Sequence, residues 1–578
     1  MDFSYIKKTS TITKVEETQL NNVVSEIRNK IYQTTKEKGG HLSANLGVVE
    51  LTVALHAVFD FPTDKLIFDV GHQCYTHKIL SGRDIEFDKL REKDGISGFP
   101  DKDESDFDPF TVGHAGCSMS SANGLCMARD KVGDDYYVVS IVGDGSIVNG
   151  ENLEALMVDS NKPKKFIVIF NDNGMSISEN VNGLYKYINK KTGMNKRITE
   201  KTIDVVNPIT DGIFERFGFK YVGIADGNDT VGLIKILRKI KVQSEDKAIF
   251  LHIKTVKGKG FSETEKHADI YHGIAPKGAV TTGGFATTLG NKLNKLIKEE
   301  KRIVAITCAM KDGTGLSLVE KENPDNFIDV GIAEDYAVTL AGGLAKGGLK
   351  PIVALYSTFM QRAYDQLLHD VCLQNLPVVF TLDRAGFVGA DGITHQGLFD
   401  LSFLSNLPNM VVLSPFNEAD LEKALDYAFS LNCPVAIRYP KSSDVEIKPL
   451  SYDESLWQTL KDGEKLNIFA VGPKMVKLAM EVEKRLDFDC KVVAIRSIKP
   501  LDTKYFDGKP IVTLEENMLN GGFGSNVATY FNKNGKTQKI LSFGVDDVFV
   551  KHAEVEAQLR DNGLSVENIA EKIKEFIK

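Results

Sequence analysis

The sequence predicts an α/β protein built from three consecutive blocks of mainly parallel sheet flanked by helices. Short apolar runs bounded by Gly, Asp and Asn recur along the chain, and helical stretches separate them. Runs of this kind are typical of parallel strands that are buried between layers of helices. The 578 residues suffice for three or four domains. The apolar fraction of 42% and the charged fraction of 26% are ordinary for a globular protein.

Each block contributes its own strands. The first block has two predicted strands, 136–142 (YYVVSIV) and 166–170 (FIVIF), with a helix at 151–159 between them. The second has strands at 303–307, 352–356, 378–382, 410–413 and 435–438. The third has strands at 466–471, 492–495 and 511–514. Linkers are expected at 276–284 and 441–454, so the predicted domains are 1–278, 279–448 and 449–578. Residues 180–207 are polar and weakly periodic, as in a surface loop.

The composition argues against several classes of protein. The net charge of −8 does not favour a nucleic-acid partner. No apolar run reaches the length of about 18 residues that a membrane span needs. The first eight residues contain no apolar segment typical of a secretory signal, and they lack the arginines of a transit peptide. Seven cysteines without a CxxC pair are expected to be reduced thiols, so we expect a cytoplasmic protein.

A metal and diphosphate site is predicted between residues 143 and 173. Gly143-Asp144-Gly145 and Asn171-Asp172-Asn173 each follow a predicted strand, and Asp144 and Asn173 are one βαβ unit apart. Both side chains should therefore lie at the carboxyl edge of a parallel sheet, where such sheets bind ligands. Their oxygens suit Mg²⁺, and the glycines let backbone amides approach a diphosphate. These residues are also common in ordinary turns, but the spacing of the two motifs favours the metal site.

Eight motifs together resemble the 1-deoxy-D-xylulose-5-phosphate synthase family, whose members have the thiamine diphosphate-binding, transketolase-like fold. They occur in one order from residue 40 to residue 400, and with RSIKPLD (496–502), EEN (515–517) and GGFG (521–524) of the third block the matches run from about residue 35 to about residue 530. The motifs are GHL (40–42), DVGHQ (69–73), GHAG (113–116), NDNGMSIS (171–178), DVGIAEDYAVT (329–339), YSTFMQRAYDQ (356–366), DRAG (383–386) and GADGITHQGLFD (389–400).

The resemblance implies two cofactors, thiamine diphosphate and Mg²⁺. Matching positions predict that the metal is held by Asp144, Asn173 and the carbonyl of Met175. They predict that the diphosphate and the rest of the cofactor contact His72, Gly113, His114, Ala115, Gly145, Ser146, Asn173, Phe261 and Phe359.

Glu334 is the first predicted catalytic residue. In the family a glutamate at this position hydrogen-bonds the pyrimidine N1′ of the cofactor and so promotes deprotonation of thiazolium C2. That role needs a partly buried carboxyl whose pKa is tuned for proton exchange. Taken alone, Glu334 would be a helix N-terminal charge favoured by the helix dipole; its motif favours catalysis.

The resemblance also implies the substrates. The family condenses pyruvate with D-glyceraldehyde 3-phosphate, releasing CO₂ and forming 1-deoxy-D-xylulose 5-phosphate, which feeds isoprenoid, thiamine and pyridoxal biosynthesis. His41 and His272 match histidines near the reacting carbonyl, where they could move protons or stabilise an oxyanion. The predicted acceptor pocket consists of Tyr356, Arg362, Arg384, Asp391, His395 and Arg438, since arginine suits a terminal phosphate.

The third block resembles the transketolase C-terminal domain, to which we assign packing and dimerisation but no catalytic residue. A homodimer is expected from the resemblance alone. The sequence departs from the family pattern at four places: Asp335-Tyr336 replaces a usual Gln-His pair, Gly174 a common Glu, Phe261 a frequent Tyr and Asn228 a usual His.

Three alternatives remain open. A transketolase would use the same fold and cofactor with a ketose donor. The E1 component of a 2-oxoacid dehydrogenase would bind a lipoyl-bearing partner. A catalytically silent paralogue is conceivable because of the Asp335-Tyr336 departure.

Overall fold

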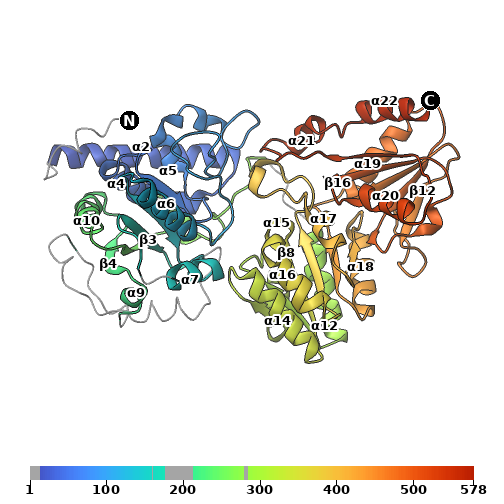
Figure 1. Cartoon of the computed structure of the whole chain (residues 1–578), viewed down its shortest axis with the longest axis horizontal. Coiled ribbons are helices and arrows are strands. Elements are labelled where there is room, and N and C mark those ends of the chain that lie inside the picture. The colour runs from blue at the N-terminus through green and yellow to red at the C-terminus, as the bar shows by residue number, and fades with distance from the viewer. Residues whose placement is uncertain (1–13, 159–160, 176–198, 200–211, 279–283) are drawn as a thin grey trace. The chain divides into compact units, whose positions relative to one another are not determined.

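The computed structural model describes residues 14–158, 161–175, 199, 212–278 and 284–578. The chain divides into two compact units, residues 1–281 (unit 1) and 282–578 (unit 2), which run from blue to green and from yellow-green to red in Figure 1. The predicted loop at 180–207 falls almost wholly outside the described residues. No helix in the described parts of the chain has the length and apolarity to cross a membrane.

Unit 1 contains a five-stranded parallel sheet in the order β1-β2-β3-β5-β4. Its strands are β1 (Lys65–Phe68), β2 (Val138–Gly143), β3 (Phe166–Asp172), β4 (Lys220–Asp226) and β5 (Ile249–Lys254). Its helices are α2 (Lys14–Lys38), α3 (Leu42–Leu46), α4 (Val49–Val58), α5 (Tyr75–Lys78), α6 (Ser118–Val132), α7 (Gly150–Met157), α9 (Ile213–Arg216), α10 (Thr230–Gln243) and α11 (Ser262–Lys266), with the short turns η1 (Ile79–Arg83) and η2 (Glu86–Lys89).

Both faces of this sheet are buried, which explains the continuous apolar runs. Alternate side chains of a strand point to opposite faces. In β3, Ile167 and Ile169 pack in one core cluster with α2, α4 and α10, while Val168 and Phe170 pack in a second cluster with α6 and α7. The strands therefore need apolar residues at every position, as the sequence predicts.

Unit 2 contains two sheets that are mostly parallel. The larger has the order β15-β10-β11-β9-β8-β6-β7 and the smaller β12-β14-β13-β16-β17. Only the pairings of β15 with β10 and of β12 with β14 are antiparallel among the described strand pairs. The strands are β6 (Ile303–Thr307), β7 (Phe327–Asp329), β8 (Lys350–Tyr356), β9 (Val379–Asp383), β10 (Val411–Leu413), β11 (Val435–Arg438), β12 (Trp457–Lys461), β13 (Asn467–Val471), β14 (Lys491–Ile495), β15 (Ser497–Lys499), β16 (Ile511–Met518) and β17 (Ile540–Val545).

Helices flank both sheets of unit 2 (Figure 1). They are α12 (Phe285–Glu299), α13 (Ser317–Glu322), α14 (Glu334–Lys346), α15 (Ser357–Met360), α16 (Tyr364–Gln366), α17 (Asp400–Ser405), α18 (Glu418–Ser430), α19 (Gly472–Glu483), α20 (Phe523–Lys533), α21 (Val555–Asp561) and α22 (Val566–Ile577). Shorter turns are η3 (Pro324–Asn326), η4 (Gln361–Ala363), η5 (Leu367–Cys372), η6 (Gly389–Thr394) and η7 (Thr503–Tyr505).

The second and third sequence blocks are joined within unit 2. Strand β15 comes from the third block but adds an antiparallel edge to the sheet of the second. One core cluster likewise combines Val412 and Leu401 of the second block with Trp457 and Phe469 of the third. The α/β fold with three mainly parallel sheets is confirmed, and the division into domains at 278 and 448 stays a prediction.

Candidate active site

Asp144 and Asn173 lie at the carboxyl ends of two neighbouring parallel strands. Strands β2 and β3 pair with Gly143 opposite Asn171. The Asp144 carboxylate accepts hydrogen bonds from the backbone N–H groups of Asn173, at 3.0 Å, and Gly174, at 2.6 Å. The side-chain oxygen of Asn173 accepts one from the backbone of Met175 at 3.1 Å. As the spacing predicts, both residues lie at the carboxyl edge of the sheet.

The residues at this turn fit a magnesium ion. Asp144 is buried, and its burial and the charge of Asp172 raise its pKa to about 7 against the opposing effect of the two backbone N–H groups. A buried carboxylate is stable as an anion only with a nearby cation. A carboxylate, an amide oxygen and backbone carbonyls are hard oxygen ligands, which Mg²⁺ prefers.

A buried tyrosine, histidine and aspartate support this turn from the neighbouring strands. Nδ1 of His252 lies 2.9 Å from the Tyr221 hydroxyl, and Nε2 of His252 lies 3.0 Å from Oδ2 of Asp172. Burial lowers the pKa of His252. Asp172 directly precedes Asn173, so these contacts orient the chain segment that carries the predicted magnesium ligand Asn173. Our sequence analysis gave His252 no role, because the contact joins strands β3, β4 and β5.

Asp69 holds the Gly113-His114-Ala115 turn. Its carboxylate, which directly follows β1, accepts hydrogen bonds from the backbone of Gly116, at 2.9 and 3.1 Å, and of Ser118, at 3.1 Å. The second predicted diphosphate turn is closed locally, because the backbone N–H of Ser146 donates to the Gly143 carbonyl at 3.1 Å. Gly145 lies between these two residues at the end of β2.

Three of the predicted histidines form one cluster in unit 1. The ring centroids of His41 and His72 are 5.4 Å apart, those of His72 and His272 5.4 Å, and those of His41 and His272 5.6 Å. His272 is half-buried, with its Nδ1 atom fully buried, and desolvation of the ring together with the nearby Lys257 holds its pKa well below the usual value. Its imidazole is therefore neutral at neutral pH and can donate or accept a proton without carrying a resident charge.

Lys257 is a site residue that the sequence analysis missed. It is buried, and burial lowers its pKa to about 8 although the charges of Asp144 and Asp269 act in the opposite direction. It interacts electrostatically with both Asp144 and His272. Asn228 helps to hold its loop by accepting a hydrogen bond from the backbone of Val256 at 2.8 Å. The available signal was the cation-rich run Lys257-Gly258-Lys259, which begins shortly after the end of β5.

Phe261 stacks on Tyr32, with ring centroids 3.9 Å apart. The ring is half-buried and lies immediately before α11. This contact gives Phe261 a packing role within unit 1, and its predicted cofactor contact stays a prediction.

Glu334 begins helix α14 in unit 2 and is buried, with 6% of its surface exposed. Burial raises the pKa of its carboxyl, while the nearby Arg362 guanidinium lowers it. Its Oε2 atom is buried and has no hydrogen-bond partner among the described residues. A buried, unsatisfied carboxyl oxygen costs stability unless a ligand donates to it, so this atom fits the pyrimidine N1′ of the predicted cofactor.

The Asp335-Tyr336 departure places a carboxylate next to Glu334, and the charge of Asp335 adds to the raised pKa of the Glu334 carboxyl. Tyr336 is 58% exposed and Asp335 is half-buried. Consecutive residues of a helix point in different directions. Within this chain, Tyr336 therefore lies on the exposed face of α14, away from the Glu334 carboxyl.

Aromatic and basic side chains of the predicted acceptor pocket gather at the carboxyl ends of β8 and β9. The rings of Tyr356 and Phe359 stack with centroids 5.7 Å apart, and His395 meets Phe359 edge-on at 5.6 Å. The Arg384 guanidinium lies 4.8 Å from the centroid of Tyr356. Arg384 also pairs with Asp383 at 2.6 Å. Asp391 interacts electrostatically with both Tyr356 and Arg384.

Arg438 is the one buried residue of the predicted acceptor pocket. Only 2% of its surface is exposed. Its Nε donates to Asp400 at 3.1 Å, and its Nη2 donates to the carbonyls of Glu516, at 3.1 Å, and Gly397, at 3.4 Å. These contacts use Nε and Nη2, because Arg438 ends a central strand, β11, under the loop at 397–400. They give Arg438 a structural role, and its predicted substrate contact stays a prediction.

Three family models match the chain. The model described as 1-deoxy-D-xylulose-5-phosphate synthase matches residues 3–201 and 192–255. The transketolase pyrimidine-binding domain matches 284–444, and the transketolase C-terminal domain matches 456–569.

Similar curated proteins agree with these matches over the full length. Proteins named 1-deoxy-D-xylulose-5-phosphate synthase from Clostridium perfringens (strain SM101) and Clostridium tetani are each 41% identical to this chain. The first alignment covers 98% of both chains and the second 96% of both. A protein of the same name from Carboxydothermus hydrogenoformans is 40% identical over 98% of this chain and 97% of its own. These matches confirm the resemblance seen in the motifs: this chain is an enzyme that belongs to the 1-deoxy-D-xylulose-5-phosphate synthase family.

Proposed function

We propose that the protein condenses pyruvate with D-glyceraldehyde 3-phosphate to give 1-deoxy-D-xylulose 5-phosphate and CO₂. The identity of 41% over nearly the whole chain to proteins named for this activity carries the proposal. The buried Oε2 of Glu334 supports it from the geometry, because it offers a ligand an acceptor that no described residue uses. In the reaction the carboxylate of pyruvate leaves as CO₂, and a new C–C bond joins the remaining two-carbon unit to the aldehyde carbon.

The cofactor and the donor substrate are assigned to the residues predicted from the family motifs. Asp144, Asn173 and the carbonyl of Met175 would hold Mg²⁺, and the turns at 113–116 and 143–146 would hold the diphosphate. When bound, thiamine diphosphate supplies the electron sink that lets a 2-oxo acid lose CO₂. Glu334 would accept a hydrogen bond from the aminopyrimidine, with its pKa held above the usual value by burial. His72 and Phe359 would also contact the cofactor.

The histidine cluster fits stabilisation of the alkoxide that forms on the acceptor's aldehyde oxygen when the new C–C bond is made. Because the pKa of His272 is held well below its usual value, its ring N–H would donate a hydrogen bond to that oxygen, and the proton that completes the new hydroxyl would come from water. His41 lies next to His272 and can relay or orient the proton.

Arg384 and Arg362 are the proposed ligands of the acceptor's phosphate. Arg384 is aimed by its ion pair with Asp383 and by the Tyr356 ring. The Nη1 atom of Arg362 is buried and has no hydrogen-bond partner in the described chain. An arginine fork with an unused donor suits a phosphate oxygen. Asp391 and His395 are proposed to bind hydroxyl groups of the acceptor.

An assay with four mixtures tests the function. The protein is incubated with pyruvate and glyceraldehyde 3-phosphate, with and without thiamine diphosphate and Mg²⁺, and both CO₂ and the pentulose phosphate are measured. We expect both products only in the complete mixture. Transfer of a ketol group from xylulose 5-phosphate without CO₂ release would favour a transketolase. Capture of a lipoyl-bearing partner would favour a 2-oxoacid dehydrogenase E1, and binding of the cofactor without any turnover would favour a silent paralogue.

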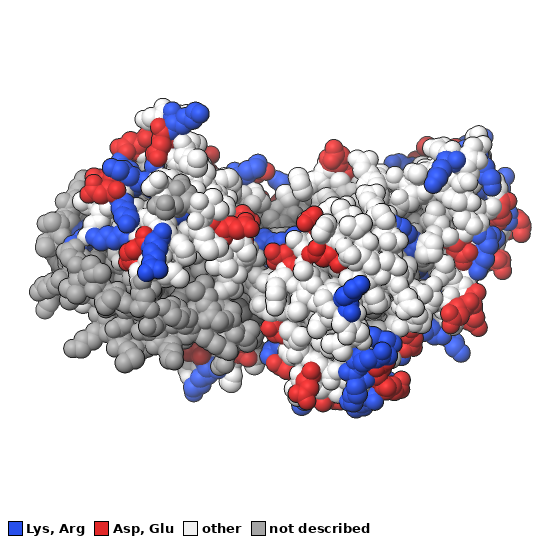
Figure 2. Space-filling view, turned by 60° about the horizontal axis from the view of Figure 1, so that its bottom comes forward, with Lys and Arg blue, Asp and Glu red and all other residues white. Residues whose placement is uncertain are grey.

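We further propose that the protein acts as a cytoplasmic homodimer. All seven cysteines are free thiols, which suits a reducing compartment. Tyr336, Leu368 and Leu373 of α14, η5 and the turn after it are 58%, 39% and 66% exposed. Figure 2 shows a broad face of unit 2 with few charged side chains. Exposed apolar groups favour association, and sedimentation equilibrium would test it: a mass near 64 rather than 128 kDa at micromolar concentration would contradict the dimer.

A further inference from the structure

The segment that carries three proposed acceptor ligands is a closed loop. It leaves β9 at Asp383, passes Arg384 and Asp391, and returns through His395. Gly386 and Gly397 close it, since each backbone N–H donates to the other's carbonyl, at 2.7 and 2.9 Å. Residues 384–397, here called the acceptor loop, therefore leave the sheet and return to it as one segment. Contacts with other parts of the chain hold the residues between Gly386 and Gly397 in place.

One end of the acceptor loop is held by the third sequence block. Oε1 of Glu516 in β16 accepts the backbone N–H of Phe387 at 3.2 Å and the ammonium of Lys474 at 3.0 Å. Lys474 also donates to the carbonyl of Phe387 at 3.4 Å. Gly386 has a φ of +83°, and a Cβ there would lie 2.6 Å from the Glu516 carboxylate. The loop backbone thus lies directly on the Glu516 side chain.

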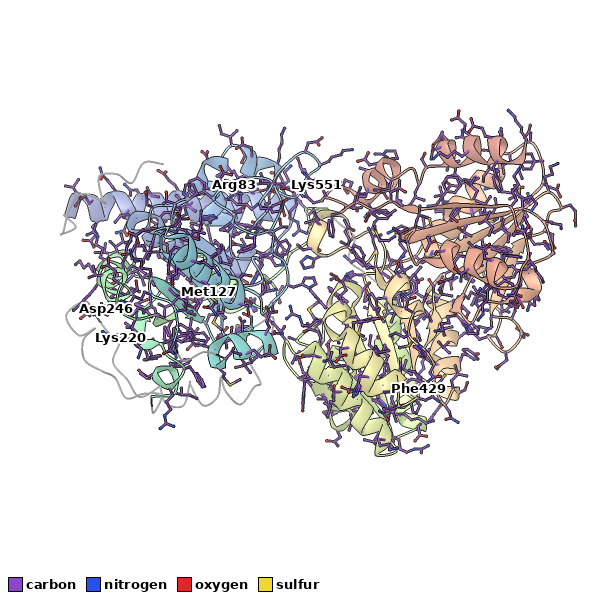
Figure 3. All side chains as sticks on the ribbon, in the orientation of Figure 1. Arg83, Met127, Lys220, Asp246, Phe429 and Lys551 are labelled. Carbon is purple, nitrogen blue, oxygen red and sulfur yellow. The ribbon has the colours of Figure 1, made fainter. Side chains whose placement is uncertain are left out.

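The middle of the loop is held by Gln558 of α21, which is 2% exposed. Its Oε1 accepts the backbone N–H of Gly389 at 3.1 Å, and its Nε2 donates to the carbonyl of Gly389 at 3.2 Å and of Lys551 at 2.8 Å. One side-chain amide thus bridges the acceptor loop and the segment around Lys551, which Figure 3 labels.

A second amide connects the same segments from the loop side. Oε1 of Gln396 accepts the N–H of Val388 at 3.0 Å, and its Nε2 donates to the carbonyl of Val550 at 3.3 Å. A Cβ at Gly392 would lie 2.8 Å from that of His552. Residues 550–558 therefore pack against the acceptor loop from Val388 to Gln396.

We infer that the C-terminal domain positions the acceptor substrate: Glu516 and Gln558 are positioning residues that hold the loop of Arg384, Asp391 and His395 in its binding conformation. The inference rests on the proposed function of that loop. Buried backbone groups that lose their partners destabilise the conformation that they belong to. If only a fraction of molecules has the loop in place, the apparent affinity for the acceptor falls by that fraction.

The test uses the full-length protein and two matched substitutions, Gln558→Leu and Gln458→Leu. Gln458 is also a buried glutamine of the third block that bridges backbone groups, accepting from Leu450 at 2.8 Å and donating to Lys448 at 3.1 Å. It lies in β12, at the edge of the sheet opposite β17. Steady-state KM values for glyceraldehyde 3-phosphate and for pyruvate are measured, together with hydrogen exchange of residues 387–397.

We expect Gln558→Leu to raise the KM for glyceraldehyde 3-phosphate about ten-fold, which corresponds to the loss of about 1.4 kcal/mol. The KM for pyruvate should stay within about two-fold, and amides 387–397 should exchange faster. Gln458→Leu should change neither KM nor the exchange of 387–397. Equal acceptor KM values in the two variants, or a parallel rise of both KM values in Gln558→Leu, would overturn the inference.

Two further experiments separate a failure of the positioning role from misfolding of the variant and from a failure of the proposed function. If Gln558→Leu does not fold, Lys474→Met, which removes a partly exposed contact to Phe387, should raise the acceptor KM by about three-fold. If the wild-type protein makes no pentulose phosphate, the proposed function fails. Hydrogen exchange then decides the positioning role alone, and unchanged exchange of 387–397 in Gln558→Leu would refute it.

Discussion

Replacing Arg438 by methionine separates the structural role found here from the substrate role that its sequence position suggests. The guanidinium makes one bond to the Asp400 carboxylate and two to backbone carbonyls, all buried. Methionine preserves most of the side-chain volume but leaves Asp400 without its cation. Breaking one partner from a buried ion pair costs about 3–5 kcal/mol, which corresponds to a fall of about 10 °C in the unfolding midpoint of a unit of this size.

Arg384→Met is the matched control, because Arg384 follows the neighbouring strand. Its side chain is 23% exposed, and its one ion-pair partner, Asp383, has a pKa raised to about 6 by burial and can take up a proton when the arginine is lost. We expect a loss of less than about 2 kcal/mol. The KM for glyceraldehyde 3-phosphate should rise by about ten-fold or more, since a charged hydrogen bond contributes about 1.5–3 kcal/mol.

The assay is differential scanning fluorimetry combined with acceptor KM measurements on both variants. Arg438→Met should lose thermal stability, and Arg384→Met should lose acceptor affinity. An Arg438→Met protein with an unchanged midpoint and a raised KM would refute the structural role and support the predicted substrate contact.

Three further predictions test other parts of the site and fold. Glu334→Gln should lower the rate of product formation by about 100-fold or more. It should not lower the unfolding midpoint, because the substitution removes a buried carboxyl that burial destabilises. An unchanged rate would contradict the catalytic role of Glu334. Removing divalent metal with EDTA, or replacing Asp144 by Ala, should abolish thiamine diphosphate binding measured by calorimetry, and Mg²⁺ should restore it only in the wild type; tight binding in EDTA would argue against the metal site. Burial raises the pKa of Glu515 to about 7 from the ordinary 4.5, so the folded state keeps a proton that the unfolded chain loses. Below about pH 4.5 the Glu515 carboxyl is protonated in both the folded and the unfolded state, so it adds no pH dependence to the free energy of unfolding. As the pH rises to 7, the free energy of unfolding falls by about 3 kcal/mol. The midpoint of the wild type relative to Glu515→Gln should fall between pH 5 and pH 8, and a difference independent of pH would count against that raised pKa.

The sequence predicted the buried strands better than the edge and connecting strands. Residues 303–307 and 435–438 are strands with the predicted bounds, because a strand that is apolar on both faces has an unmistakable pattern. The strands that were not predicted are β1, β4, β5, β7, β12, β15 and β17. All of them except β5 lie at a sheet edge. Of these, β1, β7 and β15 have four residues or fewer, and so short a run has no pattern to distinguish it from a loop. The longer strands β4, β5, β12 and β17 were missed as well.

Site residues whose positions depend on one strand end or one helix start could be predicted from the sequence. Asp144 and Asn173 come together because neighbouring parallel strands end at one edge. The sequence motif around Glu334 likewise places it at the first turn of its helix, and the structure finds it buried there. The sequence of residues near one strand end or one helix start is enough to determine such positions.

Only the tertiary structure decided which charged groups are buried and what they contact. Arg384 and Arg438 both follow or end strands of one sheet, yet one faces Tyr356 and the other is enclosed by Asp400 and Glu516. Gln558 contacts Gly389 across 169 positions of the chain. The free energy of a charge or an amide depends on its burial and its partners, and those come from segments that are distant in sequence and meet only when the chain folds.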